Sequence, residues 1–427
     1  MKYLQQYFPI DNLEDFKLKM LNWADRFNIF CFLDKHHYNN KSQTFDCILA
    51  AGSLQRINFE EAGSFMRFKD AFDPNPCWLF GHMGYNLKSE FFPSVHEKED
   101  ITGFGKGLFF EPEFIILIKN NIVQIQSYKK VCIEVFEEIN KTTEIVKGFE
   151  NPIINPRINK EAYLDTIEKL KWHIQRGDCY EINFCQEFLA DNAHIEPLLV
   201  YQKLSQLSPN PFAALYKLDD KYCICESPER YLKKTGQQII SQPIKGTAPR
   251  NKKDKHSDEK NRESLLNSIK EKAENVMVVD LVRNDLSRVC IEGSVMVEEL
   301  FEIYTFPQVY QMISTVKGVL PVNITFAEII KATFPMGSMT GAPKHKVLQL
   351  IDEYECSDRG LFSGSIGYIT PYQDFDFNVV IRSIFYNRSK SHVSFWAGSA
   401  ITFYSNAEEE YKECMLKAEA IIQVLTD

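Results

Sequence analysis

Two apolar runs in the first third of the chain are separated by a very short polar stretch. The runs are Phe114–Ile118 and Ile122–Tyr128, and the asparagines Asn120 and Asn121 lie between them. Strand-like runs on either side of such a turn predict a β-hairpin, in which the two strands pair antiparallel. With a further apolar run rich in glycine and aromatic residues, this hairpin predicts that residues 1–150 form a β-rich N-terminal region.

Residues 151–427 are expected to form a second region. Residues 151–157 carry two prolines and fit a linker. A helix is predicted directly after them, with Asn159 as a possible N-cap and Gly177 as the stop. The apolar residues that share one face of this helix are Tyr163, Ile167, Leu170 and Ile174.

Strand-like and helical segments then alternate to the C-terminus. Helices are expected at Glu271–Leu286 and Glu408–Leu425, where apolar residues recur at helical spacing. The runs Phe375–Ile384 and His392–Ile401 are expected to form paired strands.

The composition limits the kinds of partner that we expect this chain to bind. The net charge is -9 and no long Lys/Arg run occurs, so we expect no nucleic-acid partner. No apolar run approaches the ~20 residues that span a bilayer, and the N-terminus lacks a signal-peptide core, so we expect no membrane association. The eleven cysteines are scattered without a CxxC pair. That pattern is typical of reduced thiols and indicates a cytoplasmic location without a zinc site.

Pro243–Thr247 places Lys245 in a short Gly-Thr turn after a strand-like run that begins at Gln238. A lysine side chain is usually a solvated surface charge. When it is buried or set beside other cations, it loses its proton more easily and becomes an amine nucleophile. Alone, this turn fits a surface loop, so the chemical interpretation depends on the other segments.

Carboxylates occur on two predicted helices. Glu410 and Glu413 are three residues apart and Lys417 is four further on, so the three share one helix face. Glu274 lies in the other predicted helix. Each group alone fits a solvated charged face. Hard oxygen ligands from two helices would suit Mg²⁺, which takes few protein carboxylates and leaves positions for substrate oxygens.

Two further charged residues lie in apolar surroundings. Glu229 follows Pro228 at the expected start of a strand, where a carboxyl near apolar walls stays protonated and acts as a general acid. A surface turn with Arg230 is the alternative. Arg382 lies within an apolar run, so it needs a carboxylate partner from the protein or from a ligand.

The run Phe334–Lys344 packs glycines and hydroxyls before a predicted helix. It lacks the phosphate-loop pattern, because Pro343 separates Gly341 from Lys344. A nest of backbone N–H groups that binds a carboxylate stays open as its role.

From about Glu161 to Val424 the chain resembles the chorismate-utilising enzymes, and within them the aminodeoxychorismate synthase branch most closely. The resemblance implies an α+β fold of two packed antiparallel β-sheets flanked by outer helices, with the site in the cleft. Residues 151–427 would then be the chorismate-binding catalytic region. The segments that carry the resemblance are Gly177–Asn183, Ser227–Arg230, Pro243–Thr247, Ala273–Asn275, Val279–Leu286, Phe334–Lys344, Gly364–Gly367, Ile381–Ser383 and Glu410–Glu413.

The resemblance also implies ligands and roles. Mg²⁺ would be held by Glu274 and Glu413, with Glu410 close by. Glu229 would be the acid beside the leaving 4-hydroxyl of chorismate. Lys245 would be the nucleophile, with its pKa lowered by Mg²⁺ and nearby cations. The substrate-binding residues that the resemblance implies are Gly246, Thr247, Arg382, Gly398 and Lys417.

In the aminodeoxychorismate synthase branch, the lysine amine attacks C2 of chorismate and expels the 4-hydroxyl. Ammonia then attacks C4 and expels the lysine, which gives the 4-amino-4-deoxychorismate of the 4-aminobenzoate and folate branch. Ammonia is expected from a separate glutamine amidotransferase subunit, because no glutaminase cysteine–histidine site stands out. An anthranilate synthase, whose matching turn carries alanine, stays open as an alternative. So does a catalytically silent chorismate- or metal-binding regulatory protein.

Some positions depart from the family pattern. Glu181 replaces the usual glutamine, and it can either hydrogen-bond incoming ammonia or pair with a cation. Phe362 stands where a tyrosine hydroxyl often helps to bind the substrate carboxylate. Gln311 stands where a histidine is common, and Ser399-Ala400 replaces a Gly-rich pair beside Gly398.

Overall fold

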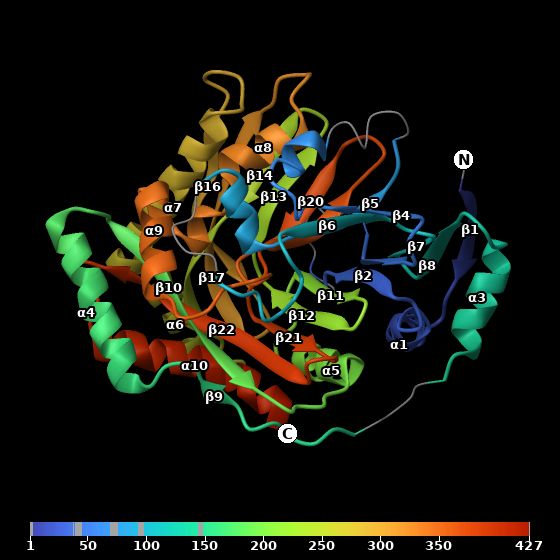
Figure 1. Ribbon diagram of the computed structural model, residues 1–427, viewed down its shortest axis with the longest axis horizontal. Helices are drawn as coiled ribbons and strands as arrows, with labels where there is room; N and C mark the ends of the chain where they lie inside the picture. The colour runs from blue at the N-terminus through green and yellow to red at the C-terminus, as the bar shows by residue number, and fades with distance from the viewer. Residues whose placement is uncertain are drawn as a thin grey trace.

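Two antiparallel sheets pack against each other, with helices around them (Figure 1). The computed structural model describes residues 3–36, 38, 45–68, 76–92, 98–143 and 148–426. Within these residues the first sheet has twelve strands and the second has ten. The α+β fold implied by the family resemblance is therefore confirmed.

The first sheet runs from an N-terminal edge to the strand that carries Glu181. Its strands, in spatial order, are β1 (Leu4–Pro9), β8 (Ile122–Ser127), β7 (Phe114–Lys119), β3 (Cys47–Ala51), β2 (Ile29–Asp34), β11 (Phe212–Leu218), β12 (Lys221–Ser227), β21 (Ser383–Asn387), β22 (His392–Thr402), β10 (Glu181–Ala190) and β18 (Gly341–Ala342). The short strand β9 (Asn155–Pro156) also pairs with β10.

The second sheet begins at the strand that carries Lys245. Its strands, in spatial order, are β15 (Ile244–Pro249), β17 (Val309–Val319), β14 (Gln238–Gln242), β13 (Arg230–Thr235), β20 (Phe375–Asn378), β19 (Ser365–Ile369), β5 (Leu79–Met83), β6 (Gly107–Glu111) and β4 (Gln55–Asn58), and β16 (Met296–Thr305) also pairs with β17.

The described helices are α1 (Leu13–Ala24), α3 (Cys132–Lys141), α4 (Lys160–Arg176), α5 (Pro197–Leu207), α6 (Lys255–Asn267), α7 (Ile269–Ser287), α8 (Phe326–Thr333), α9 (Lys344–Tyr354) and α10 (Ala407–Thr426), with short 3₁₀ turns at Phe65–Arg67, Tyr85–Glu90 and Gly337–Met339. Among the described residues, each helix is too short or too polar to cross a membrane.

Two large hydrophobic clusters form the core. One lies between the sheets, because it combines Cys31 and Tyr216 of the first sheet with Phe80 and Phe377 of the second. The other joins the opposite face of the first sheet to helices that include α1, α4 and α10. Strands from residues 1–150 occur in both sheets, and in Figure 1 the blue β4 and β5 belong to the same sheet as the orange-red β20, with β5 paired to β19. The N-terminal region is thus built into the same core as the rest of the chain.

Local sequence signals predicted several elements correctly. β7 and β8 form the expected hairpin, and Asn120 and Asn121 both have positive φ, 51° and 60°. Helix α4 begins after Asn159, whose side chain accepts a hydrogen bond from the amide of Ala162, and it ends at Gly177 with φ 88°.

One strand prediction was wrong in detail, and the expected linker contains a short strand. The run Phe375–Ile384 is not one strand, because β20 belongs to the second sheet and β21 belongs to the first. The chain changes sheets between them, and Arg382 there has φ 51°. In addition, part of the expected linker, Asn155–Pro156, pairs with β10 as β9.

Lys245 lies within strand β15 and not in a turn, which corrects the sequence expectation. The register between β15 and β17 shifts between Ile244 and Thr247, which marks a bulge, and Gly246 has φ 93°. Such an irregularity redirects side chains locally. The Gly-Thr pair therefore forms a bulge that sets the direction of Lys245.

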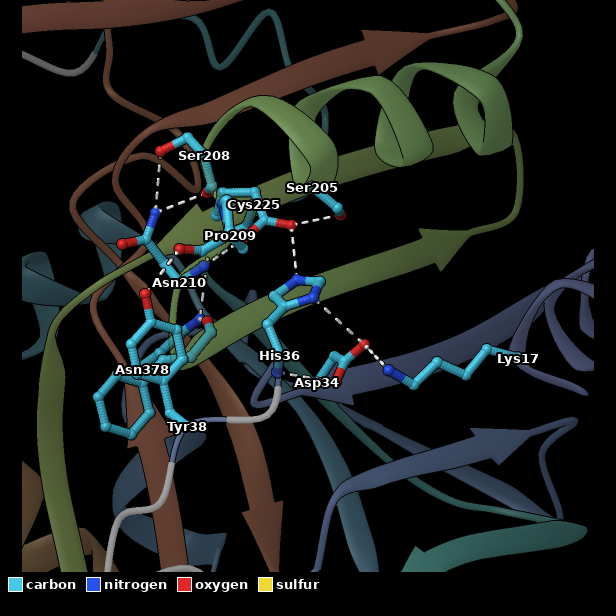
Figure 2. A network of polar contacts seen from close by, with 12 residues as sticks. Lys17, Asp34, His36, Tyr38, Ser205, Ser208, Pro209, Asn210, Cys225 and Asn378 are labelled. Atoms are coloured by element: carbon cyan, nitrogen blue, oxygen red, sulfur yellow. Dashed lines mark hydrogen bonds and ion pairs between the residues drawn. The ribbon is translucent and has the colours of Figure 1, made fainter. Parts of the chain in front are cut away.

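A buried polar network joins the N-terminal strand β2 to α5 and β12 (Figure 2). His36 Nε2 lies 3.0 Å from Glu226 Oε1, and Glu226 also accepts hydrogen bonds from the Ser205 hydroxyl and the Asn210 amide. Asp34 pairs with Lys17 at 2.9 Å. We call these six residues the His36 network. It ties elements that are distant in sequence into one unit.

Candidate active site

The candidate site lies where the ends of the two sheets meet. β10 and β18 form one end of the first sheet, and β15 forms one end of the second. Helix α7 packs against β15, β17 and β18 and so joins the two ends. Residues that are distant in the sequence are brought together at this junction.

Lys245 and Glu181 form a largely enclosed ion pair across the junction. Lys245 Nζ lies 2.9 Å from Glu181 Oε1, and the two side chains are 11% and 4% exposed. Burial lowers the pKa of Lys245, but the carboxylates of Glu181, Glu274 and Glu229 outweigh it, so the net shift is upward. The expectation that nearby cations lower this pKa is wrong for the described residues, because the charged groups around Lys245 are carboxylates. The effect of Mg²⁺ stays a prediction.

Glu229 immediately precedes β13, as expected, and is buried. Burial raises the pKa of its carboxyl to about 7, while the nearby Ser338 hydroxyl, the Lys245 ammonium and the Ile244 amide act in the opposite direction. A carboxyl of this kind is protonated in a useful fraction of molecules at neutral pH. It can therefore serve as a proton donor, and the sequence alternative of a surface turn does not apply.

The run Phe334–Lys344 lies close to Glu181 and Glu229. Gly341 of β18 pairs with β10, and a Cβ atom at Gly341 would lie 2.0 Å from the carbonyl oxygen of Glu181. Ser338 lies close enough to Glu229 to affect its pKa. Gly341 of this run therefore fits closely against Glu181, and Ser338 lies near Glu229.

Four carboxylates converge from two helices. Lys270 at the start of α7 is the common neighbour: burial lowers its pKa, but Glu274, Glu410, Glu413 and Glu271 together raise it above its ordinary value. Burial raises the pKa of Glu274 to about 7. The predicted residues Glu274, Glu410 and Glu413 thus all lie near Lys270, which sequence reasoning missed together with Glu271.

Hard carboxylate oxygens of this kind fit Mg²⁺, which is commonly held by one or two protein carboxylates together with waters and substrate oxygens. Among the described residues, no group of three or more acidic, histidine or cysteine side chains is close enough to form a complete metal site. The donor chemistry of Glu274 and Glu413 suits Mg²⁺, and binding of the ion by these residues stays a prediction.

Lys417 and Gly398 lie side by side, as the resemblance implies. Lys417 Nζ donates a hydrogen bond to the Gly398 carbonyl oxygen at 2.8 Å and pairs with Glu413 at 2.7 Å. A Cβ atom at Gly398 would lie 2.0 Å from the Phe184 carbonyl oxygen, so only glycine fits against β10 here. This pair connects the end of β22 to the carboxylates of α10.

Arg382 and the Lys245–Glu181 pair have different neighbours. The titratable groups near it are Tyr38 and Glu226, and burial lowers its pKa. Among the described residues, its guanidinium makes no hydrogen bond or ion pair. The sequence analysis left open whether a carboxylate of the protein or of a ligand pairs with Arg382. No protein carboxylate in the part of the chain that the structure describes does so. Binding of a substrate carboxylate by Arg382 stays a prediction.

The remaining predicted site residues, and the positions that depart from the family pattern, lie in different environments. Gly246 packs beside Glu271 and Leu265, and Thr247 is exposed. Phe362 stacks on Trp396 in the core. Gln311 pairs with Thr247 through the β15–β17 ladder and is buried, and its amide atoms have no hydrogen-bond partner among the described residues. Gln311 was noted in the sequence only as a departure, and its burial beside β15 could not be predicted.

A family model described as "chorismate binding enzyme" matches residues 28–423. The chain belongs to the chorismate binding enzyme family. Among solved structures with a similar fold, anthranilate synthase component I from Streptococcus pneumoniae has a TM-score of 0.76 at 24% identity, covering 90% of this chain and 93% of that one. The menaquinone-specific isochorismate synthase MenF from Escherichia coli has a TM-score of 0.78 at 16% identity, covering 100% and 94%. These two structures show the shared fold.

Several curated relatives are more similar in sequence. Aminodeoxychorismate synthase component 1 of Salmonella typhimurium is 36% identical over 263 residues, which cover 62% of this chain and 57% of that protein. The component 1 protein of Bacillus subtilis is 35% identical over 266 residues, covering 62% and 56%. An anthranilate synthase component I-like protein of Synechocystis is 31% identical over 356 residues, covering 82% and 72%. The chain thus matches little more than half the length of the two component 1 proteins.

Proposed function

We propose that this chain aminates chorismate at C4 to give 4-amino-4-deoxychorismate, with Lys245 as a covalent nucleophile. The observation that carries the proposal is the largely enclosed Lys245, held 2.9 Å from Glu181 and electrostatically coupled to the protonatable Glu229. A buried amine and a neutral carboxyl are the nucleophile and the acid that displacement of a ring hydroxyl needs. The similarity to two component 1 proteins supports the same activity.

The proposed reaction has two displacements. The Lys245 amine forms a bond to C2, the two ring double bonds shift, and the C4–O bond breaks as Glu229 donates the proton that turns the leaving hydroxide into water. Ammonia then forms a bond to C4, the double bonds shift back, and the C2–N bond to Lys245 breaks. The lysine leaves with the electron pair of that bond, and Glu229 regains its proton from solvent.

The carboxylate cluster would hold Mg²⁺ through Glu274 and Glu413, with Glu410 close by. When bound, the ion would neutralise charge on the ring carboxylate of chorismate. Lys417 keeps the Gly398 backbone in place through its 2.8 Å hydrogen bond to the carbonyl oxygen. Binding of a substrate carboxylate by Arg382, Lys417 and the backbone around Gly246, Thr247 and Gly398 is part of the proposal.

We also propose that ammonia comes from a separate glutamine amidotransferase subunit in the cytoplasm. The name "component 1" of the similar proteins supports a partner subunit. In this scheme the chain serves the 4-aminobenzoate branch of folate synthesis.

Product analysis tests the proposal. The chain is incubated with chorismate, Mg²⁺ and ammonium, and the aminated product is identified. We expect 4-amino-4-deoxychorismate. Products aminated at C2 alone would instead support an anthranilate synthase, which the Synechocystis relative keeps as the second candidate. Binding of chorismate without turnover would support the regulatory alternative.

A further inference from the structure

One carboxylate contacts the proposed nucleophile directly. Lys245 Nζ donates a hydrogen bond to Glu181 Oε1 at 2.9 Å. Glu229 and Glu274 affect the pKa of Lys245 through charge, but neither forms an ion pair or hydrogen bond with its ammonium group among the described contacts. Glu181 is thus the carboxylate in position to exchange a proton with this lysine.

The backbone of Glu181 is held on both sides. It pairs with Ala342 of β18 and with Thr402 of β22, and Gly341 fits against its carbonyl oxygen. The residue is buried, and its second oxygen, Oε2, has no hydrogen-bond partner among the described residues. Among the described residues, the hydrogen bond from Lys245 to Oε1 is therefore the side-chain contact that this carboxylate makes.

The proposed chemistry needs such a base. An ammonium group has no electron pair to attack C2, and the carboxylates around Lys245 hold it in the protonated form. Glu229 does not fit the role of base, because the leaving hydroxyl requires it to enter the reaction with its proton. The proton on Lys245 must therefore go to another group before the C2–N bond can form.

We propose that Glu181 is the general base that activates Lys245, an inference that rests on the proposed function. The Glu181 carboxylate takes one proton from the Lys245 ammonium, and the free amine then forms the bond to C2. After ammonia has displaced the lysine, the Glu181 carboxyl returns this proton to the released amine. The proton moves between these two side chains only, so the ion pair is restored after each turnover.

The test uses Glu181→Gln and reads the first displacement by itself. Glutamine keeps the length of the side chain and an oxygen that accepts a hydrogen bond from Lys245, but it cannot take the proton. Chorismate and Mg²⁺ are mixed with the chain without ammonium, and growth of the chorismate-minus-water adduct on Lys245 is followed by intact mass. Rates are measured from about pH 6 to about pH 10, toward the ordinary pKa of lysine.

For the wild type we expect adduct formation at neutral pH. For Glu181→Gln we expect a rate lower by roughly 10²–10⁴-fold at neutral pH, and this loss relative to the wild type should shrink at alkaline pH, where solvent frees the amine. Chorismate binding should change little. An equal loss at all pH values would mean that Glu181 only positions Lys245, and would overturn the inference.

Two further variants complete the design. Asp34→Asn removes another buried lysine–carboxylate pair, the 2.9 Å Lys17–Asp34 contact, and should leave the pH profile of adduct formation unchanged. Glu181→Asp keeps a carboxylate and should keep the neutral-pH rate profile at reduced height. If Glu181→Gln does not fold, an alkaline-shifted profile in Glu181→Asp overturns the inference. A wild type that forms neither adduct nor 4-amino product contradicts the proposed function itself.

Discussion

Gly341 lies so close to Glu181 that a methyl group on its Cα would approach the Glu181 carbonyl oxygen to 2.0 Å. Gly341→Ala should therefore displace β18 or β10 and lower stability by about 1–3 kcal/mol, as overpacking does elsewhere. Chemical denaturation measures the loss, and adduct formation on Lys245 should slow because Glu181 moves. Gly148→Ala is the matched control, since nothing lies within 4 Å of its added Cβ. Equal stability of the two variants would contradict this prediction.

Glu229 is the proposed acid, and its pKa is raised to about 7, chiefly by burial. Because a general acid must carry its proton, the rate of C4–O cleavage should fall as the pH rises through about 7. Glu229→Gln should lower the turnover number by roughly 10²–10⁴-fold and remove this alkaline decline. The measurement is the pH dependence of the first displacement, and an unchanged alkaline decline in the variant would exclude Glu229 as its source.

The carboxylates of α7 and α10 are proposed to hold Mg²⁺. Glu274→Gln and Glu413→Gln should each weaken Mg²⁺ binding by about tenfold or more, measured by titrating activity after chelation and by direct calorimetry. Glu419→Gln is a control on the same helix as Glu413, at an exposed position. Activity that survives complete chelation would show that the ion is not needed.

The His36 network makes stability depend on pH. Burial lowers the pKa of His36, but Asp34 and Glu226 outweigh it, so the folded-state value is raised above 6.5. The stabilisation is therefore fully present below about pH 6.5 and is lost as the pH rises through the folded-state pKa. Lys17 and Arg382 are the cations near these carboxylates, and Tyr38 and Tyr201 lie beside them.

Denaturation of the wild type and of His36→Gln at several pH values between about 6 and about 9 tests this dependence. The wild type should lose more stability over that range than the variant. His345→Gln, which changes an exposed histidine, should behave like the wild type. Parallel curves for wild type and His36→Gln would show that His36 does not titrate with folding.

Local sequence signals predicted the elements whose ends are set by their own residues. Asn159 and Gly177 gave the bounds of α4, and the paired asparagines gave the β7–β8 hairpin, because capping and turn chemistry act within a few residues. Continuous apolarity did not reveal that the chain changes sheets near Arg382. A strand in either sheet has the same pattern, so only long-range packing decides.

In the candidate site, too, the sequence predicted individual residues but not the long-range contacts between them. Lys245, Glu229 and the carboxylates of two helices were chosen from sequence, and the structure brings Lys245 together with Glu229 and Glu274. The partner of Lys245 could not be chosen, because Glu181 is 64 positions away along the chain and lies in the other sheet. Because this contact was not predicted, the charges around Lys245 were not predicted either. The groups around the lysine are anions, although cations were expected.

The most direct test of the central claim follows Lys245 itself. With chorismate and Mg²⁺ but no ammonium, intact mass should show a chorismate-minus-water adduct that maps to Lys245, and Lys245→Ala should form no adduct. With ammonium, Lys245→Ala should lose amination at C4. If Lys245→Ala makes 4-amino-4-deoxychorismate as fast as the wild type, the covalent role of Lys245 is wrong.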